Sequence, residues 1–368
     1  MNIRLWVTLT LSLITGLFAT QCTRNDQQRM DQNMEANALV LSQDGTAFAK
    51  NSLSFLNTTD WQITKSETIR SSVESDMFID PLGRVWISYW SLSGDNIDVY
   101  DLKGKKVATL QACEQARSGI QFSDKYAFVV CMEDGFSGSV SVLDLTELTF
   151  KKQLKIGSSG SYMLIASAIN DKYLLISGLT DDGPDERSRY TVLTLVNTET
   201  LEIESQIGPL DDLDVWSILP YQDKFILLNV HSWRQTQSDR EDILLLTPGI
   251  EPHIELLQLF PSPLWGALNG DILYTYHNPT WNQLNSDSTR TLGKLNLVTG
   301  ESETWPLPDN WNADDFEVVD DDLVFAFWNP EDSSKDGLYR FDFEDKNLHQ
   351  VMQIQNASEI IKIPGQQK

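Results

Sequence analysis

Short apolar runs, each opened by a tight polar turn, recur along the chain. The segments DKYAFVVC, DKYLLISG and DKFILLNV begin at Asp124, Asp171 and Asp223, at intervals of 47 and 52 residues. Each is followed by a polar loop, by a second run such as SVSVLDL from Ser139, and by a third, more polar run. Alternation with period two is typical of half-buried β-strands, and lysines are common in edge strands. The pattern predicts strands throughout the chain.

The same unit can be followed seven times. A short run before each turn, such as GIQFS from Gly119, completes four strands per unit. Units of roughly 40 to 50 residues with four strands each are the signature of a β-propeller. The sequence therefore predicts an all-β fold, a seven-bladed β-propeller with four-stranded antiparallel blades, and leaves six or eight blades as alternatives. The turns begin at Gly45, Gly83, Asp124, Asp171, Asp223, Gly270 and Asp321, and the first copy, with runs GTAFAKN, SLSFLNT and QITKSETI, is the weakest.

The Asp-Lys turn has a structural interpretation. Aspartate favours turns because its carboxylate bonds nearby backbone N–H groups, and glycine replaces it where a positive φ is needed. The aromatic residue two positions later, Tyr126, Tyr173 or Phe225, is expected to pack between neighbouring blades. A ring of Asp-Lys pairs acting as a binding site is the functional alternative.

One strand is left over at the C-terminus. SEIIKIPG, Ser358 to Gly365, follows a seventh unit that already has its outer strand. We expect it to pair with the first blade near Ala38 to Leu41 and to close the ring, because a closed ring leaves no unpaired interior edge.

Two units resemble a known repeat. NIDVYDLKGKKVATL from Asn96 and GSVSVLDLTELTFKKQLKIG from Gly138 are similar to the YVTN-type repeat of quinoprotein-dehydrogenase-like propellers. The resemblance covers residues 37 to 363. It implies the architecture but no activity, because such propellers serve many functions. No residue pattern assigns a quinone, so we expect no cofactor.

The N-terminus indicates export. The basic stretch MNIR precedes Leu5 to Ala19, a 15-residue apolar segment that is short for a transmembrane helix but typical of a signal peptide. Leu17, Ala19 and Cys22 resemble a bacterial lipobox, although Gln21 stands where that pattern requires a small residue. We expect lipidation of Cys22, with ordinary cleavage after Ala19 as the alternative.

These features predict a domain order and a location. Residues 1–21 would be a signal peptide, 22–36 a polar tether and 37–368 a single β-propeller domain. The protein would then be lipid-anchored in the bacterial cell envelope, or periplasmic if the cysteine is not modified. Contact with the membrane would come only through the lipid on Cys22.

Charge narrows the range of partners. The chain has 53 acidic and 28 basic residues and a net charge of -25. An acidic surface repels phosphate backbones, so nucleic acid is excluded as a partner class. Solubility is the simplest interpretation of the remaining charge.

Variation in loop length is concentrated after the second strand of each unit. The long loops TDDGPDERSR, HSWRQTQSDRE, HNPTWNQLNSDST and WNPEDSSKDG would all emerge on one face, here called the loop-rich face. Insertions on one face of a repeat array often mark a binding face. Tryptophan with polar residues suits a protein partner or a small polar ligand such as a glycan; the alternative is that these residues only pack and shape the loops. The predicted binding residues are Trp90, His231, Trp233, His277, Asn278, Trp281, Trp328 and Asn329.

Two further cysteines lie toward the same face. Cys113 precedes an innermost strand, and Cys131 ends the strand that pairs with it. An exported chain meets oxidising conditions, so a disulfide is one interpretation and a buried free thiol at Cys131 is the other.

Signals for catalysis are weak. The chain has four histidines, and no HExxH, CxxC, GxSxG or phosphate-binding glycine loop occurs. A metal at His231 and His277 would need further ligands, so no metal is predicted. We therefore expect a non-catalytic binding propeller and keep an exported hydrolase or lyase, with its site at the central channel mouth, as the alternative. The acids considered for that role are Asp214, Asp314, Asp315 and Glu317.

Overall fold

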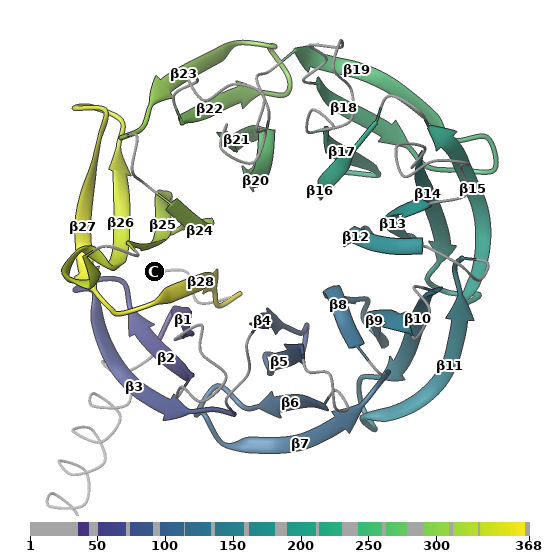
Figure 1. The fold of residues 1–368 in the computed structure, drawn as a ribbon, viewed down its shortest axis with the longest axis horizontal. Coiled ribbons are helices and arrows are strands. Elements are labelled where there is room, and N and C mark those ends of the chain that lie inside the picture. The colour runs from purple at the N-terminus through teal and green to yellow at the C-terminus, as the bar shows by residue number, and fades with distance from the viewer. Residues whose placement is uncertain are drawn as a thin grey trace, which may run out of the picture.

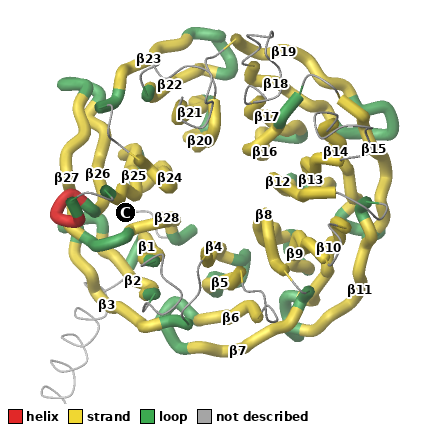
Figure 2. The backbone as a smooth tube through the Cα atoms, viewed as in Figure 1, coloured by secondary structure: helices red, strands yellow, loops and turns green. Residues whose placement is uncertain are grey.

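The computed structural model contains seven four-stranded antiparallel sheets arranged in a ring (Figure 1). This confirms the all-β, seven-bladed prediction. The backbone tube coloured by secondary structure shows strands throughout, with a single short helix, η1 (Ser333–Lys335), among the described residues (Figure 2). The structure describes residues 36–43, 51–70, 74–90, 96–113, 115–133, 137–157, 162–180, 190–210, 213–229, 242–259, 263–277, 290–308, 312–329 and 332–364.

Each blade runs from an innermost strand at the ring centre to an outer strand at the rim. From the centre outward, the blades are β28 (Ala357–Lys362), β1 (Ala38–Ser42), β2 (Ser52–Asn57) and β3 (Gln62–Thr68) in blade 1; β4 (Glu74–Ile79), β5 (Val85–Trp90), β6 (Asn96–Tyr100) and β7 (Lys106–Gln111) in blade 2; β8 (Gln115–Phe122), β9 (Tyr126–Glu133), β10 (Ser137–Asp144) and β11 (Thr149–Lys155) in blade 3; β12 (Tyr162–Ile169), β13 (Tyr173–Thr180), β14 (Tyr190–Asn197) and β15 (Glu202–Leu210) in blade 4; β16 (Val215–Tyr221), β17 (Lys224–Asn229), β18 (Asp242–Thr247) and β19 (His253–Leu259) in blade 5; β20 (Pro263–Asn269), β21 (Ile272–His277), β22 (Thr291–Asn296) and β23 (Ser302–Pro306) in blade 6; and β24 (Asn312–Val319), β25 (Asp322–Trp328), β26 (Gly337–Asp342) and β27 (Asn347–Gln353) in blade 7.

The ring is closed by pairing of the two ends of the chain. Strand β28 lies antiparallel to β1, with Ala38 opposite Lys362 and Leu41 opposite Glu359. Beyond the strand, the backbone N–H of Ile363 donates to the carbonyl of Asn37. The prediction that SEIIKIPG closes the ring on the first blade is confirmed.

The expected boundaries of the first unit were wrong. Its second strand is β1, which comes before Gly45, and not the segment GTAFAKN that follows it; β1 pairs with β2 from Ala38 opposite Leu56 to Ser42 opposite Ser52. Residues 44–50 lie outside the described residues. The error arises because the innermost strand of blade 1 comes from the other end of the chain, so no hairpin joins it to the second strand.

The core is built between the blades. Seven apolar clusters occur among the described residues, one for each pair of neighbouring blades. In β1, Leu39 and Leu41 pack toward blade 2, whereas Ala38 and Val40 pack toward blade 7. Successive side chains of a strand point to opposite faces, so a strand between two blades is apolar on both faces. This explains why the second strands read as continuous apolar runs.

The aromatic residue after each Asp-Lys turn has the predicted role. Tyr173 and Phe225 are buried together in the cluster between blades 4 and 5. Tyr126 packs against the cluster between blades 3 and 4.

The backbone N–H groups of these turns are capped by a different residue from the expected aspartate. The residue before the Asp-Lys pair accepts the backbone N–H groups: Ser123 Oγ accepts from Lys125 and Tyr126, and Asn170 Oδ1 accepts from Lys172 and Tyr173. Glycine does supply positive φ in other turns, with φ of 74° at Gly83. The aspartate of the pair is left facing solvent, because the preceding side chain already satisfies the turn.

The two faces of the ring carry different connections. Hairpins between first and second strands, and between third and fourth strands, lie on one face, here called the hairpin face. Loops between second and third strands, and links to the next blade, lie on the loop-rich face. Within the part of the chain that the structure describes, no helix has the length and apolarity needed to cross a membrane. The predicted signal peptide, tether and Cys22 lie outside the described residues.

Candidate functional site

Only part of the predicted binding surface can be described. His231, Trp233, Asn278 and Trp281 lie outside the described residues. Trp90 and Trp328 are the last residues of β5 and β25, and His277 is the last residue of β21. These three strand ends lie on the loop-rich face, and the binding role of the three residues stays a prediction.

Two predicted residues have clear local roles. His277 is only 2% exposed, and its Nε2 lies 2.8 Å from Thr275 Oγ1. Burial lowers the pKa of His277 to about 3, so its ring is neutral at physiological pH. Asn329 shapes the following loop, because its Oδ1 accepts from Asp332 N and its own N–H donates to Asp336 Oδ1. Contact of either residue with a ligand stays a prediction.

A pocket of about 360 Å³ opens at the ring centre on the loop-rich face. It is formed by the starts of innermost strands β4, β24 and β28, together with β20 and the residue that follows β1. We call it the axial pocket. It is lined by Gln43, Ser75, Asp76, Trp265, Asp314, Asp315, Ser358 and Glu359.

The axial pocket contains some of the acids that the sequence suggested and others that it did not. Asp314 and Asp315 line it, whereas Asp214 and Glu317 are not among the lining residues. Sequence reasoning missed Asp76 and Glu359. The signal available was their position near the start of an innermost strand, which is also where Asp314 and Asp315 lie.

The carboxyl groups connect neighbouring innermost strands. Glu359 Oε2 of β28 accepts from the backbone N–H of Met77 in β4 at 2.6 Å, and Glu359 also hydrogen bonds to Asp76. Asp315 Oδ2 of β24 accepts from the backbone N–H of Ile360 at 3.0 Å. The acids are therefore held in place by the backbone of the adjacent blade.

Burial raises the pKa of two acids in the axial pocket. Desolvation raises the pKa of Asp315 to about 7, with repulsion from Glu317 adding to the effect. Desolvation, followed by repulsion from Asp76 and Asp315, raises the pKa of Glu359 well above its usual range. Glu359 therefore holds its proton more tightly than an ordinary glutamate does and can share it with the Asp76 carboxylate.

Gln43 and Trp265 complete the wall of the pocket. The Gln43 amide bridges to blade 2, because its Nε2 donates to the Ser75 carbonyl and its Oε1 accepts from Ser75 N–H. One face of the Trp265 indole is stacked on Tyr276, with ring centroids 5.8 Å apart and planes inclined by 5°. The arrangement is a small acidic pocket with one aromatic wall, which can bind a polar or cationic group or transfer protons.

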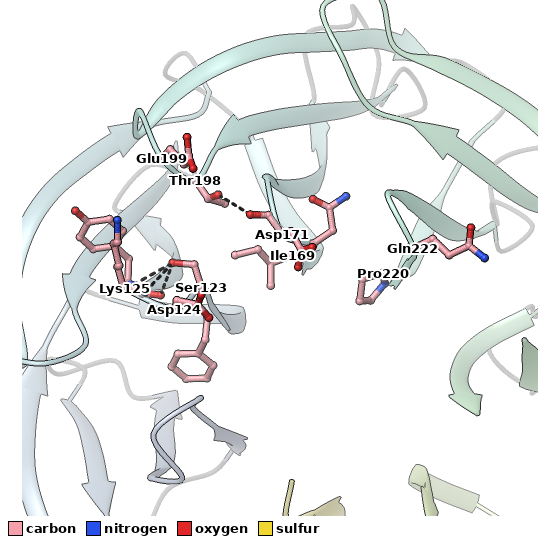
Figure 3. A pocket seen from close by; sticks show the side chains of 12 residues that line it. Ser123, Asp124, Lys125, Ile169, Asp171, Thr198, Glu199, Pro220 and Gln222 are labelled. Carbon is pink, nitrogen blue, oxygen red and sulfur yellow. Dashed lines mark hydrogen bonds between the residues drawn. The ribbon is translucent and has the colours of Figure 1, made fainter. Parts of the chain in front are cut away.

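A larger pocket, of about 750 Å³, lies on the hairpin face (Figure 3). Hairpins of blades 3, 4 and 5 form it with the turn after β14. Many of its polar groups are used within the turns, as when Thr198 Oγ1 donates to the Lys172 and Asp171 carbonyls. The Asp-Lys turns thus border a polar depression, although sequence reasoning assigned them a structural role alone. The lining residues are Phe122, Ser123, Asp124, Lys125, Tyr126, Ile169, Asn170, Asp171, Thr198, Glu199, Pro220 and Gln222.

One cluster has the composition of a metal site. Asp342, Asp345 and His349 lie close together around the turn between β26 and β27, with His349 Nε2 2.7 Å from Asp345 Oδ2. Asp342 also accepts backbone N–H groups of its turn, as Asp144 does at the same place in blade 3. The repeated use of this position as a turn cap assigns the cluster a structural role.

A disulfide joins Cys113, in the link that leads into blade 3, to Cys131 of β9. Their Cα atoms are 6.0 Å apart and the residues are 18 positions apart in the chain. Cys131 is buried in the cluster between blades 2 and 3. The bond ties the entrance of blade 3 to its second strand near the loop-rich face.

Comparisons with known proteins identify the fold but no family. No family model matches the chain, and no curated protein matches it. The β-propeller domain of the Trilobed protease from Pyrococcus furiosus is 10% identical, with a TM-score of 0.57 over 86% of this chain and 94% of that chain. A functionally unknown protein from Desulfotomaculum acetoxidans is 14% identical, with a TM-score of 0.57 over 89% and 98%. Kuenenia stuttgartiensis hydrazine synthase is 10% identical, with a TM-score of 0.56 over 88% and 95%.

These similarities support the propeller architecture alone, because the identities are low and the proteins differ in function. The Trilobed protease domain has an open Velcro topology. In the present chain, by contrast, β28 pairs with β1 across the two ends.

Proposed function

We propose that this protein is a non-catalytic β-propeller of the cell envelope that binds a protein partner or a small polar ligand through its loop-rich face. In this proposal, residues 1–21 direct export and a lipid on Cys22 anchors the propeller to the membrane. The observation that carries the proposal is the axial pocket, which opens on the face where the long loops gather.

Two properties of the axial pocket favour binding. Its volume of about 360 Å³ falls within the range of small-molecule sites. Its acids are fixed by backbone groups of neighbouring blades, as Glu359 is by Met77 N–H, so the wall is preorganised. A rigid pocket on the face from which the long loops leave the strands is a usual arrangement for recognition on a repeat scaffold.

A hydrolase or lyase is the second candidate, favoured by one observation. Asp315 has a pKa of about 7 and lies in the same pocket as the proton-sharing pair Asp76 and Glu359. Carboxyl groups with separated proton affinities are typical of acid–base catalysis. We favour binding because Asp315 and Glu359 each use one carboxyl oxygen to hold a neighbouring strand.

The test is a thermal-shift screen of the purified protein against amines, amino acids, peptides and oligosaccharides. A ligand of the axial pocket should raise the melting temperature of the wild type and of Asp171→Asn, whose carboxylate lies on the hairpin face. The same ligand should have a smaller effect on Asp314→Asn and Trp265→Ala. Equal shifts in all four proteins would contradict the proposed site.

The enzyme candidate has a separate readout. Incubation with chromogenic esters and lactones, with product measured over time, should show no turnover above the buffer rate. Turnover that is lost in Asp315→Asn but retained in Asp171→Asn would overturn the non-catalytic proposal.

A further inference from the structure

The axial pocket presents negative charge to whatever enters it. Four of its eight lining residues are acidic and none is basic. The strands that form the axial pocket have one basic side chain among their described residues. It is Lys362, at the far end of β28. That amine lies 3.9 Å from Asp320, and its charge partly opposes the rise in the pKa of Glu317 that burial causes. The charged groups facing the Glu359 carboxyl are Asp76 from β4 and Asp315 from β24.

Two of the acids share a proton. Asp76 and Glu359 hydrogen bond to each other, and two carboxyl groups can do so only when one of them is protonated. The Met77 N–H holds Glu359 in position for this contact. A ligand N–H donor that enters the pair would replace the shared proton and leave both groups ionised.

A third acceptor in the same pocket lacks a partner. The Ser75 hydroxyl is buried, with the residue only 3% exposed, and its Oγ forms no hydrogen bond. A buried hydroxyl without a partner is costly, so such a group points to a missing partner. Ser75 lies next to Asp76 at the start of β4, and both residues line the pocket.

The aromatic wall suits a positive charge. Trp265 lines the pocket and has one indole face covered by Tyr276. A cation over the other face would gain a cation–π attraction, which is strongest with tryptophan. Carboxylates, a hydroxyl acceptor and an indole in one small pocket form the set of groups that recognises an ammonium ion.

We propose that the axial pocket binds a primary ammonium group, whose three N–H donors match Asp76, Glu359 and Ser75 Oγ, and that binding displaces the proton shared by the two carboxyl groups. The ammonium is carried by a free alkylamine or by a lysine side chain of a protein partner. This inference rests on the proposed binding function and names the ligand class of the same site.

Isothermal titration with n-butylamine tests the chemistry directly. Butylamine should bind, n-butanol of similar shape should not, and tetramethylammonium, which has no N–H donor, should bind more weakly. Titrations in buffers of different ionisation enthalpy should show proton release on binding. The affinity should increase as the pH is raised, because the shared proton becomes easier to displace. Equal affinity for butylamine and butanol would overturn the proposal, as would the absence of proton release.

Matched variants test which residues of the axial pocket contact the ammonium group. Asp76→Asn should weaken butylamine binding by about tenfold or more, because a charge-assisted hydrogen bond is lost. Ser75→Ala removes an unpartnered hydroxyl, so it should fold normally and weaken binding by a few-fold, roughly the effect of one neutral hydrogen bond. Asp171→Asn, with the same charge change on the hairpin face, should bind as the wild type does. If Asp76→Asn fails to fold, unchanged binding in Ser75→Ala still overturns the proposal.

The two sources of the ammonium are separated by a second probe. N-acetyl-lysine amide binding more tightly than butylamine would identify a lysine of a protein partner, and the reverse order would identify a free amine. The wild type could instead bind a neutral oligosaccharide and no amine, with that binding lost in Trp265→Ala and Asp314→Asn. This outcome would overturn the ammonium assignment and leave the proposed function in place.

Discussion

The Asp315 carboxylate in β24 accepts a hydrogen bond from the backbone N–H of Ile360 in β28, at 3.0 Å. On the other side of β28, Glu359 accepts a hydrogen bond from the backbone N–H of Met77 in β4. The strand that closes the ring is therefore held laterally by one carboxyl group on each side. Blades 7, 1 and 2 are joined at the point where the two ends of the chain meet.

This arrangement predicts how stability depends on pH. The pKa of Asp315 is about 7 in the folded protein, whereas an unfolded aspartate has a pKa of about 4. The folded state binds the proton more tightly, so the contribution of Asp315 to stability is complete below about pH 4 and is lost as the pH rises through about 7. We expect the melting temperature to fall between about pH 5 and about pH 8, with a loss of about 1 to 3 kcal/mol in the free energy of unfolding.

Asp315→Asn is the matching variant, because an amide oxygen can still accept from Ile360 N–H but does not titrate. Its melting temperature should fall less over the same pH range, as measured by circular dichroism. Asp171→Asn, which changes an exposed carboxylate, should retain the wild-type slope. A slope in Asp315→Asn equal to that of the wild type would refute the assignment.

Removal of the closing strand should destabilise the whole ring. A chain that ends at Asn356 loses the partner of β1 and the buried residues Ala357, Ile360 and Ile363. Burial of an aliphatic side chain such as isoleucine contributes roughly 1.5 to 3 kcal/mol, so the loss should be several kcal/mol. Thermal melts would measure it. A chain that ends at Pro364 keeps all of β28 and is the control; equal melting temperatures for the two truncations would contradict the closure.

The disulfide predicts a redox-dependent stability. Closing a loop of 18 residues stabilises a fold by about 3 kcal/mol in the chain-entropy model. Reductant should therefore lower the denaturant midpoint of the wild type, and Cys113→Ala should show the lower midpoint with or without reductant. Thiol counting under denaturing conditions should find Cys113 and Cys131 unreactive until they are reduced. A wild-type midpoint that does not respond to complete reduction would show that the bond contributes nothing.

The repeat could be predicted because its signals are local. The turns before Tyr126 and Tyr173, and the apolar runs after them, depend on residues that are close together in the chain. Even the ring closure was accessible, because Ser358 to Gly365 formed a strand without a partner in its own unit. The bounds of the first blade were predicted wrongly because its pairing is not local. The residue opposite Leu41 is Glu359, and no local pattern connects the two.

The sequence by itself predicted the four-stranded repeat, the strand order within a blade and the strand that closes the ring, because period-two alternation and turn chemistry act over a few residues. The structure decided between six, seven and eight blades, since it contains seven sheets. Only the tertiary structure decided which acids meet. Met77 and Glu359 are 282 residues apart and become neighbours because the ring brings the innermost strands of blades 1 and 2 together. Burial at that junction then set the protonation of Glu359 and Asp315, because desolvation depends on what surrounds a carboxyl group and not on its place in the chain.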